Sequence, residues 1–390
     1  MDFKAVDGVL SIFLAGRIDS HNADQTGAEI DKILGENPAE SVVFDAENLE
    51  YISSAGLRVV LRIRKARPEL KIINVSSEVY EIFEMTGFSE MMPIEKAYRR
   101  VSVDGCEVIG QGANGKVYRL DPDTIIKVYL NPDSLSDIHR ERELARTAFV
   151  AGIPTAIPYD VVKVGEGYGS VFELLSAKSF AKLIAAEPEN LDKYVGLYVD
   201  LLKKIHSTVI NSGNIPNQKE VTLDWVRFLK EYLPESTYNK LYGMVEAIPE
   251  SKYLMHGDYH IKNVMMQNDE VLLIDMDTLC LGNPVFEFAS IYLAYVGFSE
   301  LNHDNVQSFL GIPFETAGKI WDKTLRMYFG TDDETVLEEV ANKAKIIGYT
   351  RLMRRTIRRN GFNDELGKKT IELAKNNIIE LVDKVSSLEY

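Results

Sequence analysis

The segment 256–263 reads His-Gly-Asp-Tyr-His-Ile-Lys-Asn and carries side chains that could take part in phosphoryl transfer. That chemistry needs an oriented hydroxyl, a metal ion that bridges phosphate oxygens and groups that neutralise charge. The position of Asp258 predicts a carboxylate that accepts the proton of the nucleophile. Asn263 and Asp275, which ends an apolar strand-like segment, are predicted ligands of Mg²⁺, an ion that prefers oxygen ligands. The alternative is that these three side chains only cap turns beside buried strands.

A glycine-rich turn precedes this segment at residues 110–118, between two strand-like segments. Its glycines are Gly110, Gly112 and Gly115. Glycines at such spacing let the backbone approach a phosphate and adopt positive φ, although a glycine-rich hairpin is the commoner meaning of the pattern alone. We therefore interpret the turn as a nucleotide-binding loop only together with the motifs that follow it.

A lysine and a glutamate follow the glycine-rich turn at the spacing expected of a phosphate-binding pair. Lys127 lies in a strand-like segment and is predicted to reach the α- and β-phosphates, and Glu141 on the next helix is predicted to orient it. Glu143 is the alternative partner, but on a helix it faces another direction. Further on, Glu173 and Leu175 fall where a strand leaves the sheet, and their backbone groups are predicted to bind adenine; an ordinary strand end is the alternative.

Taken in this order, the motifs in residues 105–360 resemble the aminoglycoside phosphotransferase and choline-kinase branch of the protein-kinase-like fold. The loop has His-Gly-Asp where protein kinases usually have His-Arg-Asp, and Met276-Asp277 stands where they have Phe-Gly. Asn283 and Glu287 replace the aspartates usual in that family, so no role is assigned to them. The resemblance implies ATP as the donor, with GTP as an alternative, Mg²⁺ as the metal ion and a small-molecule hydroxyl as the acceptor.

The first 98 residues carry a second resemblance, in segment 42–61 above all, to STAS domains of the anti-sigma-factor-antagonist type. In that family a serine at this loop-to-helix junction is phosphorylated, and the phosphate switches partner binding. Ser54 is the corresponding candidate, although the chain reads Ser-Ser-Ala-Gly where many antagonists read Asp-Ser-Ser-Gly. A helix N-terminus tolerates a phosphate, but Ser53 and Ser54 could equally serve only as helix caps. The resemblance implies a protein partner for this domain.

Apolar patterns predict the elements that position these residues. In the first hundred residues, predicted strands and helices alternate. The strands are 9–14, which ends at Gly16, 41–45 and 71–75. The helices run from Asp19 or Ser20 to residue 34, over 57–63 and over 77–85. Four strand-like stretches and one helix follow, and then mostly helices. We expect an α/β STAS-like domain at 1–99 and an α+β two-lobed kinase-like domain at 100–390, with a strand-rich lobe at 105–175 and a helical lobe at 176–390.

The composition excludes several classes of protein. A net charge of −15 and a pI near 5.0 argue against nucleic acid or an anionic membrane as the main partner. The two cysteines, Cys106 and Cys280, are far apart and lack metal-ligand spacing, so neither a disulfide framework nor a zinc site is expected. No run of about 18 apolar residues occurs, and we expect a cytoplasmic protein.

One late segment carries arginines at the spacing of a single helix face: Arg351, Arg354, Arg355, Arg358 and Arg359. They are either a solvated face paired with the acidic surface or a site for an anionic substrate or partner, the acidic N-terminal domain included. The sequence as a whole predicts a phosphotransferase that transfers the γ-phosphoryl group to a small-molecule hydroxyl and is regulated or recruited through its STAS-like domain. The alternative is a signalling protein kinase or a nucleotide-binding scaffold.

Overall fold

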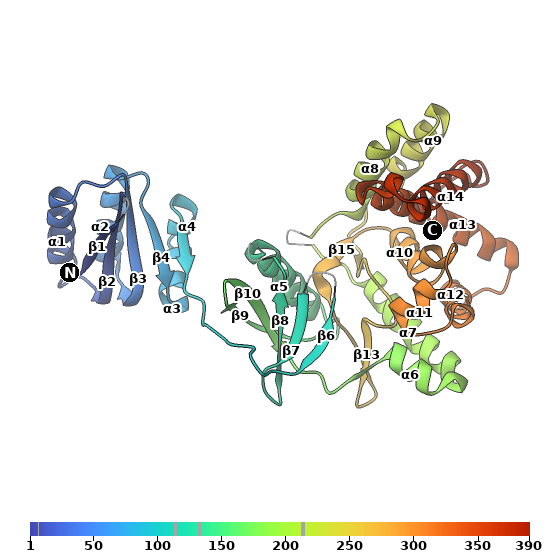
Figure 1. The fold of residues 1–390 in the computed structure, drawn as a ribbon, viewed down its shortest axis with the longest axis horizontal. Helices are drawn as coiled ribbons and strands as arrows, with labels where there is room; N and C mark the ends of the chain where they lie inside the picture. The colour runs from blue at the N-terminus through green and yellow to red at the C-terminus, as the bar shows by residue number, and fades with distance from the viewer. Residues whose placement is uncertain (7, 113–114, 132–133, 212–214) are drawn as a thin grey trace. The chain divides into compact units, whose positions relative to one another are not determined.

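The computed structural model describes residues 1–6, 8–112, 115–131, 134–211 and 215–390 (Figure 1). The chain divides into two compact units, each described here by itself. The first unit comprises Met1–Ser102 with Val162–Gly165, and the second comprises Val103–Val161 with Glu166–Tyr390.

The first unit is a five-stranded sheet of order β1-β2-β3-β4-β5 with four helices. Strand β1 pairs antiparallel with β2, whereas the pairs from β2 to β5 are parallel and are joined by helical crossovers. The strands are β1 (Phe3–Val6), β2 (Val9–Ile18), β3 (Ser41–Ile52), β4 (Lys71–Val75) and β5 (Ile94–Lys96). The helices are α1 (Ala23–Glu36), α2 (Ser54–Ala66), α3 (Ser77–Met85) and α4 (Phe88–Met91). This unit confirms the predicted α/β class.

Two sequence-based expectations for this unit are wrong in detail. Strand β2 does not end at Gly16 but continues to Ile18, because Gly16 takes a φ of +66° at a register shift and β2 keeps pairing with β3 as far as Ile52. Helix α1 is capped by neither Asp19 nor Ser20; it begins after Asn22, and the Asp19 carboxylate instead accepts the His21 N–H.

The second unit begins with a strand-rich lobe, a five-stranded sheet of order β6-β7-β8-β10-β9 with one long helix, α5. The neighbouring pairs from β6 to β10 are antiparallel. The strands are β6 (Val108–Gln111), β7 (Gly115–Arg119), β8 (Thr124–Tyr129), β9 (Pro158–Val164, which belongs to this unit as far as Val161) and β10 (Gly167–Glu173), and α5 spans Leu135–Val150. This lobe supplies the glycine-rich turn, Lys127 and Glu141.

The rest of the second unit is mainly helical. Its helices are α6 (Phe180–Ala186), α7 (Leu191–Ser207), α8 (Gln218–Phe228), α9 (Glu235–Glu246), α10 (Pro284–Tyr295), α11 (Asp304–Leu310), α12 (Phe314–Phe329), α13 (Glu334–Arg358) and α14 (Glu365–Leu381). Its short strands are β11 (Lys178–Ser179), β12 (Leu254–Met255), β13 (Val264–Gln267), β14 (Glu270–Leu273) and β15 (Cys280–Leu281). Every residue of α10 from Val285 to Tyr295 is buried. The predicted two-lobed kinase-like class is confirmed, and in the described part of the chain no helix is long and apolar enough to cross a membrane.

Candidate active site

The loop that carries Asp258, residues 256–263, is held by a buried carboxylate of α10. Glu287 is fully buried, and its two carboxylate oxygens accept the backbone N–H groups of His256, at 2.6 Å, and Gly257, at 3.0 Å. Burial alone raises the pKa of Glu287, but the neighbouring His206 and the N–H of Gly257 lower it overall, so the carboxylate is charged at neutral pH. Sequence reasoning assigned no role to Glu287, because glutamate is not the residue usual at this position.

Two hydroxyl groups complete this anchoring. Thr278 donates to the carbonyl of His256 at 2.8 Å, and Ser290 of α10 donates to the carbonyl of Gly257 at 3.0 Å. Gly257 takes a φ of +81°, and a Cβ there would lie 2.4 Å from the carbonyl oxygen of Thr278. Only glycine fits this position, which explains the residue before Asp258.

His256 ties the loop to the strand that precedes Asp275. The backbone N–H of Asp258 donates to His256 Nδ1 at 3.2 Å, which makes Nδ1 an acceptor. The other ring nitrogen, Nε2, then carries the hydrogen and donates to the carbonyl of Ile274 at 3.0 Å. A single neutral imidazole therefore fixes the distance between the Asp258 loop and the backbone of Asp275.

The side chain of Asp258 is half-exposed and lies 3.4 Å from His260 Nε2. Burial alone raises its pKa, but the side-chain hydrogen bond from His260 and the charge of Arg351 lower the pKa of Asp258 to about 2. Asn263 donates its side-chain N–H to the carbonyl of Asp258 at 3.0 Å. At neutral pH the loop thus presents an ionised carboxylate beside an amide whose oxygen is not used in that bond.

Lys127 of β8 lies between two carboxylates from different parts of the second unit. Its Nζ contacts Glu141 Oε1 of α5 at 2.8 Å and Asp275 Oδ1 at 2.9 Å. Burial alone lowers the pKa of Lys127, but the charges of Asp275 and Glu141 raise it above its ordinary value. Glu141 also accepts a hydrogen bond from the Tyr129 hydroxyl, whereas Glu143 is exposed. The structure therefore brings Lys127, Glu141 and Asp275 together.

Asp275 occupies a backbone conformation that non-glycine residues rarely adopt, with a φ of +66°. Such conformations persist where the surrounding structure enforces them, and they cluster at functional sites. Two residues on, burial and the charge of Asp275 raise the pKa of Asp277 to about 7, against the opposing effect of Lys127. Negative charge therefore exceeds positive charge on this side of the Asp258 loop.

The three glycines of the predicted nucleotide loop have different surroundings. A Cβ at Gly115 would lie 2.4 Å from the carbonyl oxygen of Val128, so strand packing alone requires glycine there. Gly112 has open space around it, and its N–H donates to the carbonyl of Gly115 at 2.9 Å. Gly110 has only the Val117 side chain nearby. Residues 113 and 114, which lie between Gly112 and Gly115 in the sequence, are outside the described residues.

The predicted adenine-binding segment follows β10. The N–H of Glu173 donates to Ile157 O and that of Leu174 to Asp123 O, at 3.2 and 2.7 Å. Among the described residues, the N–H of Leu175 makes no such backbone bond. A cavity of about 430 Å³ also opens beside Glu141; its lining includes Tyr129, Arg140 and Asp277.

The first unit places the two candidate serines differently. The Ser53 hydroxyl oxygen accepts the N–H groups of Ala55 and Gly56 at 3.2 and 3.4 Å, so Ser53 is the N-cap of α2. Ser54 is the first residue of the helix and is exposed. The capping alternative thus applies to Ser53, and Ser54 remains accessible.

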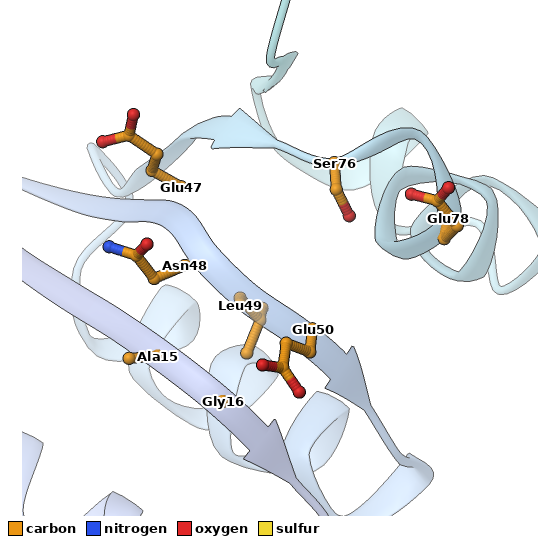
Figure 2. Close-up of a pocket in the computed structure, with 8 residues that line it drawn as sticks. All are labelled: Ala15, Gly16, Glu47, Asn48, Leu49, Glu50, Ser76 and Glu78. Atoms are coloured by element: carbon orange, nitrogen blue, oxygen red, sulfur yellow. The ribbon is translucent and has the colours of Figure 1, made fainter.

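A pocket of about 620 Å³ lies elsewhere in the first unit, beside β3 and the start of α3 (Figure 2). Its charged lining residues are all acidic: Glu47, Glu50 and Glu78. Ser54 does not line this pocket. The negative charge of the pocket lining disfavours an anionic ligand.

Comparison with known proteins identifies two families along the chain. Residues 105–310 match the model of the phosphotransferase enzyme family, and residues 1–101 match that of the STAS domain. The chain therefore belongs to the phosphotransferase enzyme family and carries an N-terminal STAS domain; it is a phosphotransferase.

Two curated relatives match the STAS domain. The putative anti-sigma factor antagonist BtrV of Bordetella bronchiseptica is 39% identical over 93 residues, which are 23% of this chain and 79% of BtrV. The anti-sigma F factor antagonist of Paenibacillus polymyxa is 30% identical over 91 residues, 22% of this chain and 78% of that protein.

Two solved structures resemble the second unit. A thermostable mutant of aminoglycoside phosphotransferase APH(4)-Ia is 14% identical, with a TM-score of 0.49, and the match covers 72% of this chain and 94% of that one. A choline/ethanolamine kinase family protein from Mesorhizobium loti is 12% identical, with a TM-score of 0.46, and the match covers 71% and 88%.

The anchoring role of Glu287 gives a first prediction. Glu287→Gln removes the charge that both loop N–H groups contact, so we expect the free energy of unfolding at pH 7 to fall by about 2–4 kcal/mol. Because the pKa of Glu287 is lowered from its ordinary 4.5, its contribution is present above about pH 4.5 and is lost as the pH falls through the lower folded value.

Chemical denaturation at several pH values measures both effects. The difference between wild type and Glu287→Gln should shrink on acidification. Glu372→Gln, which removes an exposed carboxylate from α14, is the control and should stay within about 0.5 kcal/mol of wild type. Equal stabilities of wild type and Glu287→Gln at pH 7 would contradict the anchoring role.

Proposed function

We propose that this phosphotransferase transfers the γ-phosphoryl group of ATP to a hydroxyl group of a small molecule. The observation that carries the proposal is the convergence of Lys127, Glu141 and Asp275 with an ionised Asp258 on a rigidly anchored loop. Glu141 is buried and fixes Lys127, whereas Asp275 is half-exposed, so a phosphate group can reach Lys127 from the Asp275 side.

The donor set fits Mg²⁺, the ion that the family implies. Asp275 and Asn263 offer a carboxylate and an amide oxygen, which are ligands that this hard ion prefers. In the part of the chain that the structure describes, no three His, Cys, Asp or Glu side chains are grouped closely enough to hold a metal ion. An ion here therefore needs phosphate oxygens of the nucleotide to complete its coordination, and once bound it would neutralise phosphate charge.

The residues of this chain then orient the reactants. The acceptor hydroxyl oxygen attacks the γ-phosphorus, the bond from that phosphorus to the β,γ-bridging oxygen breaks, and ADP leaves. The hydroxyl proton goes to Asp258. With its pKa at about 2, Asp258 is a weak base, so its main contribution is to orient the hydroxyl by accepting its hydrogen bond.

For the STAS domain we propose recruitment of a protein partner, with Ser54 as the site at which phosphorylation controls binding. Curated relatives of this domain are anti-sigma factor antagonists, and Ser54 is exposed at a helix N-terminus, where a phosphate is electrostatically favoured.

Nucleotide binding is the first test. ATP with Mg²⁺ should raise the melting temperature by several degrees, because a ligand at 100 times its Kd stabilises the folded state by about 2.7 kcal/mol. Asp275→Ala should remove the metal-dependent part of the shift. Asp200→Ala, an exposed position on α7, is the matched control and should keep it. No shift of the wild type at millimolar Mg·ATP would refute the proposed function.

The role of Asp258 is tested separately. Asp258→Asn keeps the size of the side chain but removes the charge, so kcat should fall about 10²- to 10⁴-fold while Mg·ATP still raises the melting temperature. The measurement is ADP release with an accepted hydroxyl compound. Full turnover by this variant would mean that Asp258 is not the proton acceptor.

A third test concerns Ser54. A tethered phosphoryl-transfer domain provides a high effective concentration, so incubation of the full chain with Mg·ATP should add phosphate at Ser54. Mass spectrometry of digested protein locates the phosphate, which should be absent from Ser54→Ala and strongly reduced in Asp258→Asn. If the wild type gains none at Ser54, this domain does not phosphorylate it, and phosphorylation would have to come from another kinase.

A further inference from the structure

The C-terminal half of α13 carries positive charge without a described carboxylate partner. Residues 346–363 include five Arg residues and no Asp or Glu: Arg351, Arg354, Arg355, Arg358 and Arg359. Among the described residues, no carboxylate lies at ion-pair distance from any of the five arginines, which we call the arginine face. By contrast, Arg326 contacts three carboxylates. The arginine face is thus solvated at Arg355, Arg358 and Arg359, but the described residues show no ion pair between it and the acidic surface.

The arginine face adjoins the Asp258 loop. Arg351 donates to the Ser290 hydroxyl oxygen, and Ser290 donates to the carbonyl of Gly257, the residue before Asp258. Arg351 also acts on the Asp258 side chain through its charge. It lowers the pKa of Asp258, although this effect is smaller than those of burial and of the neighbouring histidines. Partial desolvation of the Arg355 guanidinium and the neighbouring arginines lower the pKa of Arg355, and Asp258 partly offsets their effect. An acceptor whose hydroxyl reaches Asp258 therefore lies within the field of these arginines.

Aromatic rings support three of the guanidinium groups. Arg351 lies over Trp225 at 5.7 Å, Arg354 over Phe228 at 5.8 Å and Arg355 over Phe298 at 4.7 Å from the ring centroids. A ring covers the face of a guanidinium and leaves its N–H edge available for oxygen ligands. The buried Nε of Arg354 has no hydrogen-bond partner, while the Arg355 side chain is exposed. The Arg355 guanidinium is therefore held against a ring and is open to a ligand.

We propose, resting on the function proposed above, that the acceptor is a hydroxyl compound that carries a carboxylate or phosphate group, which the arginine face binds through Arg355. Arginine is the side chain best matched to both groups, because its planar N–H donors pair with two oxygens at once. A polycationic acceptor such as an aminoglycoside is disfavoured, since like charges brought together at a binding site cost several kcal/mol. The acceptor hydroxyl reaches Asp258 while its anionic group lies on α13.

A binding experiment on the full chain tests this proposal without knowledge of the acceptor. Inorganic phosphate and, separately, acetate are titrated calorimetrically into protein saturated with Mg²⁺ and a non-hydrolysable ATP analogue, so that the nucleotide site is already filled. We expect at least one anion to bind. Arg355→Gln should weaken it roughly 10- to 100-fold, the usual scale for a lost charge-assisted hydrogen bond, and Arg355→Lys should restore part of the affinity.

Lys319→Gln, which removes one exposed positive charge from α12, is the control and should bind as the wild type does. The two titrants separate a phosphate-bearing from a carboxylate-bearing acceptor. Failure of the ATP analogue to bind would refute the proposed function. Normal analogue binding with no binding of either anion, or with binding that Arg355→Gln does not weaken, would overturn the anionic-acceptor proposal alone.

Turnover provides a second measurement. ADP release is compared among glucose, glucose 6-phosphate, glucuronate and glucosamine, four hydroxyl compounds of similar shape and different charge. Preferential use of glucose 6-phosphate or glucuronate supports the proposal, and preferential use of glucosamine overturns it. If none is used, the anion titrations decide.

Discussion

The carboxylate of Glu287 links the centre of the helical lobe to the loop that carries Asp258. It lies on α10, a helix that is buried on all sides, and it satisfies two consecutive backbone N–H groups that would otherwise be orphaned in the interior. Leaving a buried donor unsatisfied costs about 1–3 kcal/mol, so the loop conformation with a carboxylate beneath it is strongly preferred over alternatives. The positions of Asp258, Asn263 and, through His256, Asp275 all depend on this interaction.

Charge is distributed unequally around the anchored loop. On the side of Lys127, the carboxylates of Glu141, Asp275 and Asp277 outnumber the cation, which suits a metal ion and a nucleotide that arrive together. On the side of α13, guanidinium groups lie without described carboxylate partners. Asp258 lies between the two regions, and its low pKa reflects cations rather than solvent exposure, since burial alone would raise it.

Sequence patterns predict much of the fold and of the candidate active site. The features that they do not predict depend on contacts between distant parts of the chain. The spacing of Lys127 and Glu141 was sufficient to predict their pairing, because a strand and the next helix bring such residues together in this fold. The role of Glu287 could not be predicted, because it depends on the reach of a longer side chain from a buried helix. Strand β2 runs past Gly16 because a parallel partner continues beside it, which is information held in β3 and not in the local sequence.

The anchoring residues and the arginine face meet at Arg351. Its bond to Ser290 joins the loop-anchoring network, whereas Arg354 and Arg355 lie over aromatic rings. A substitution of Arg351 therefore disturbs the Asp258 loop and removes a positive charge at the same time. Its effect cannot show whether positioning of the loop or binding of an anionic group was lost. Arg355 has no described hydrogen bond to the loop and touches the ring of Phe298 instead. A substitution at Arg355 therefore removes charge from the arginine face while the network from Glu287 through Ser290 stays in place.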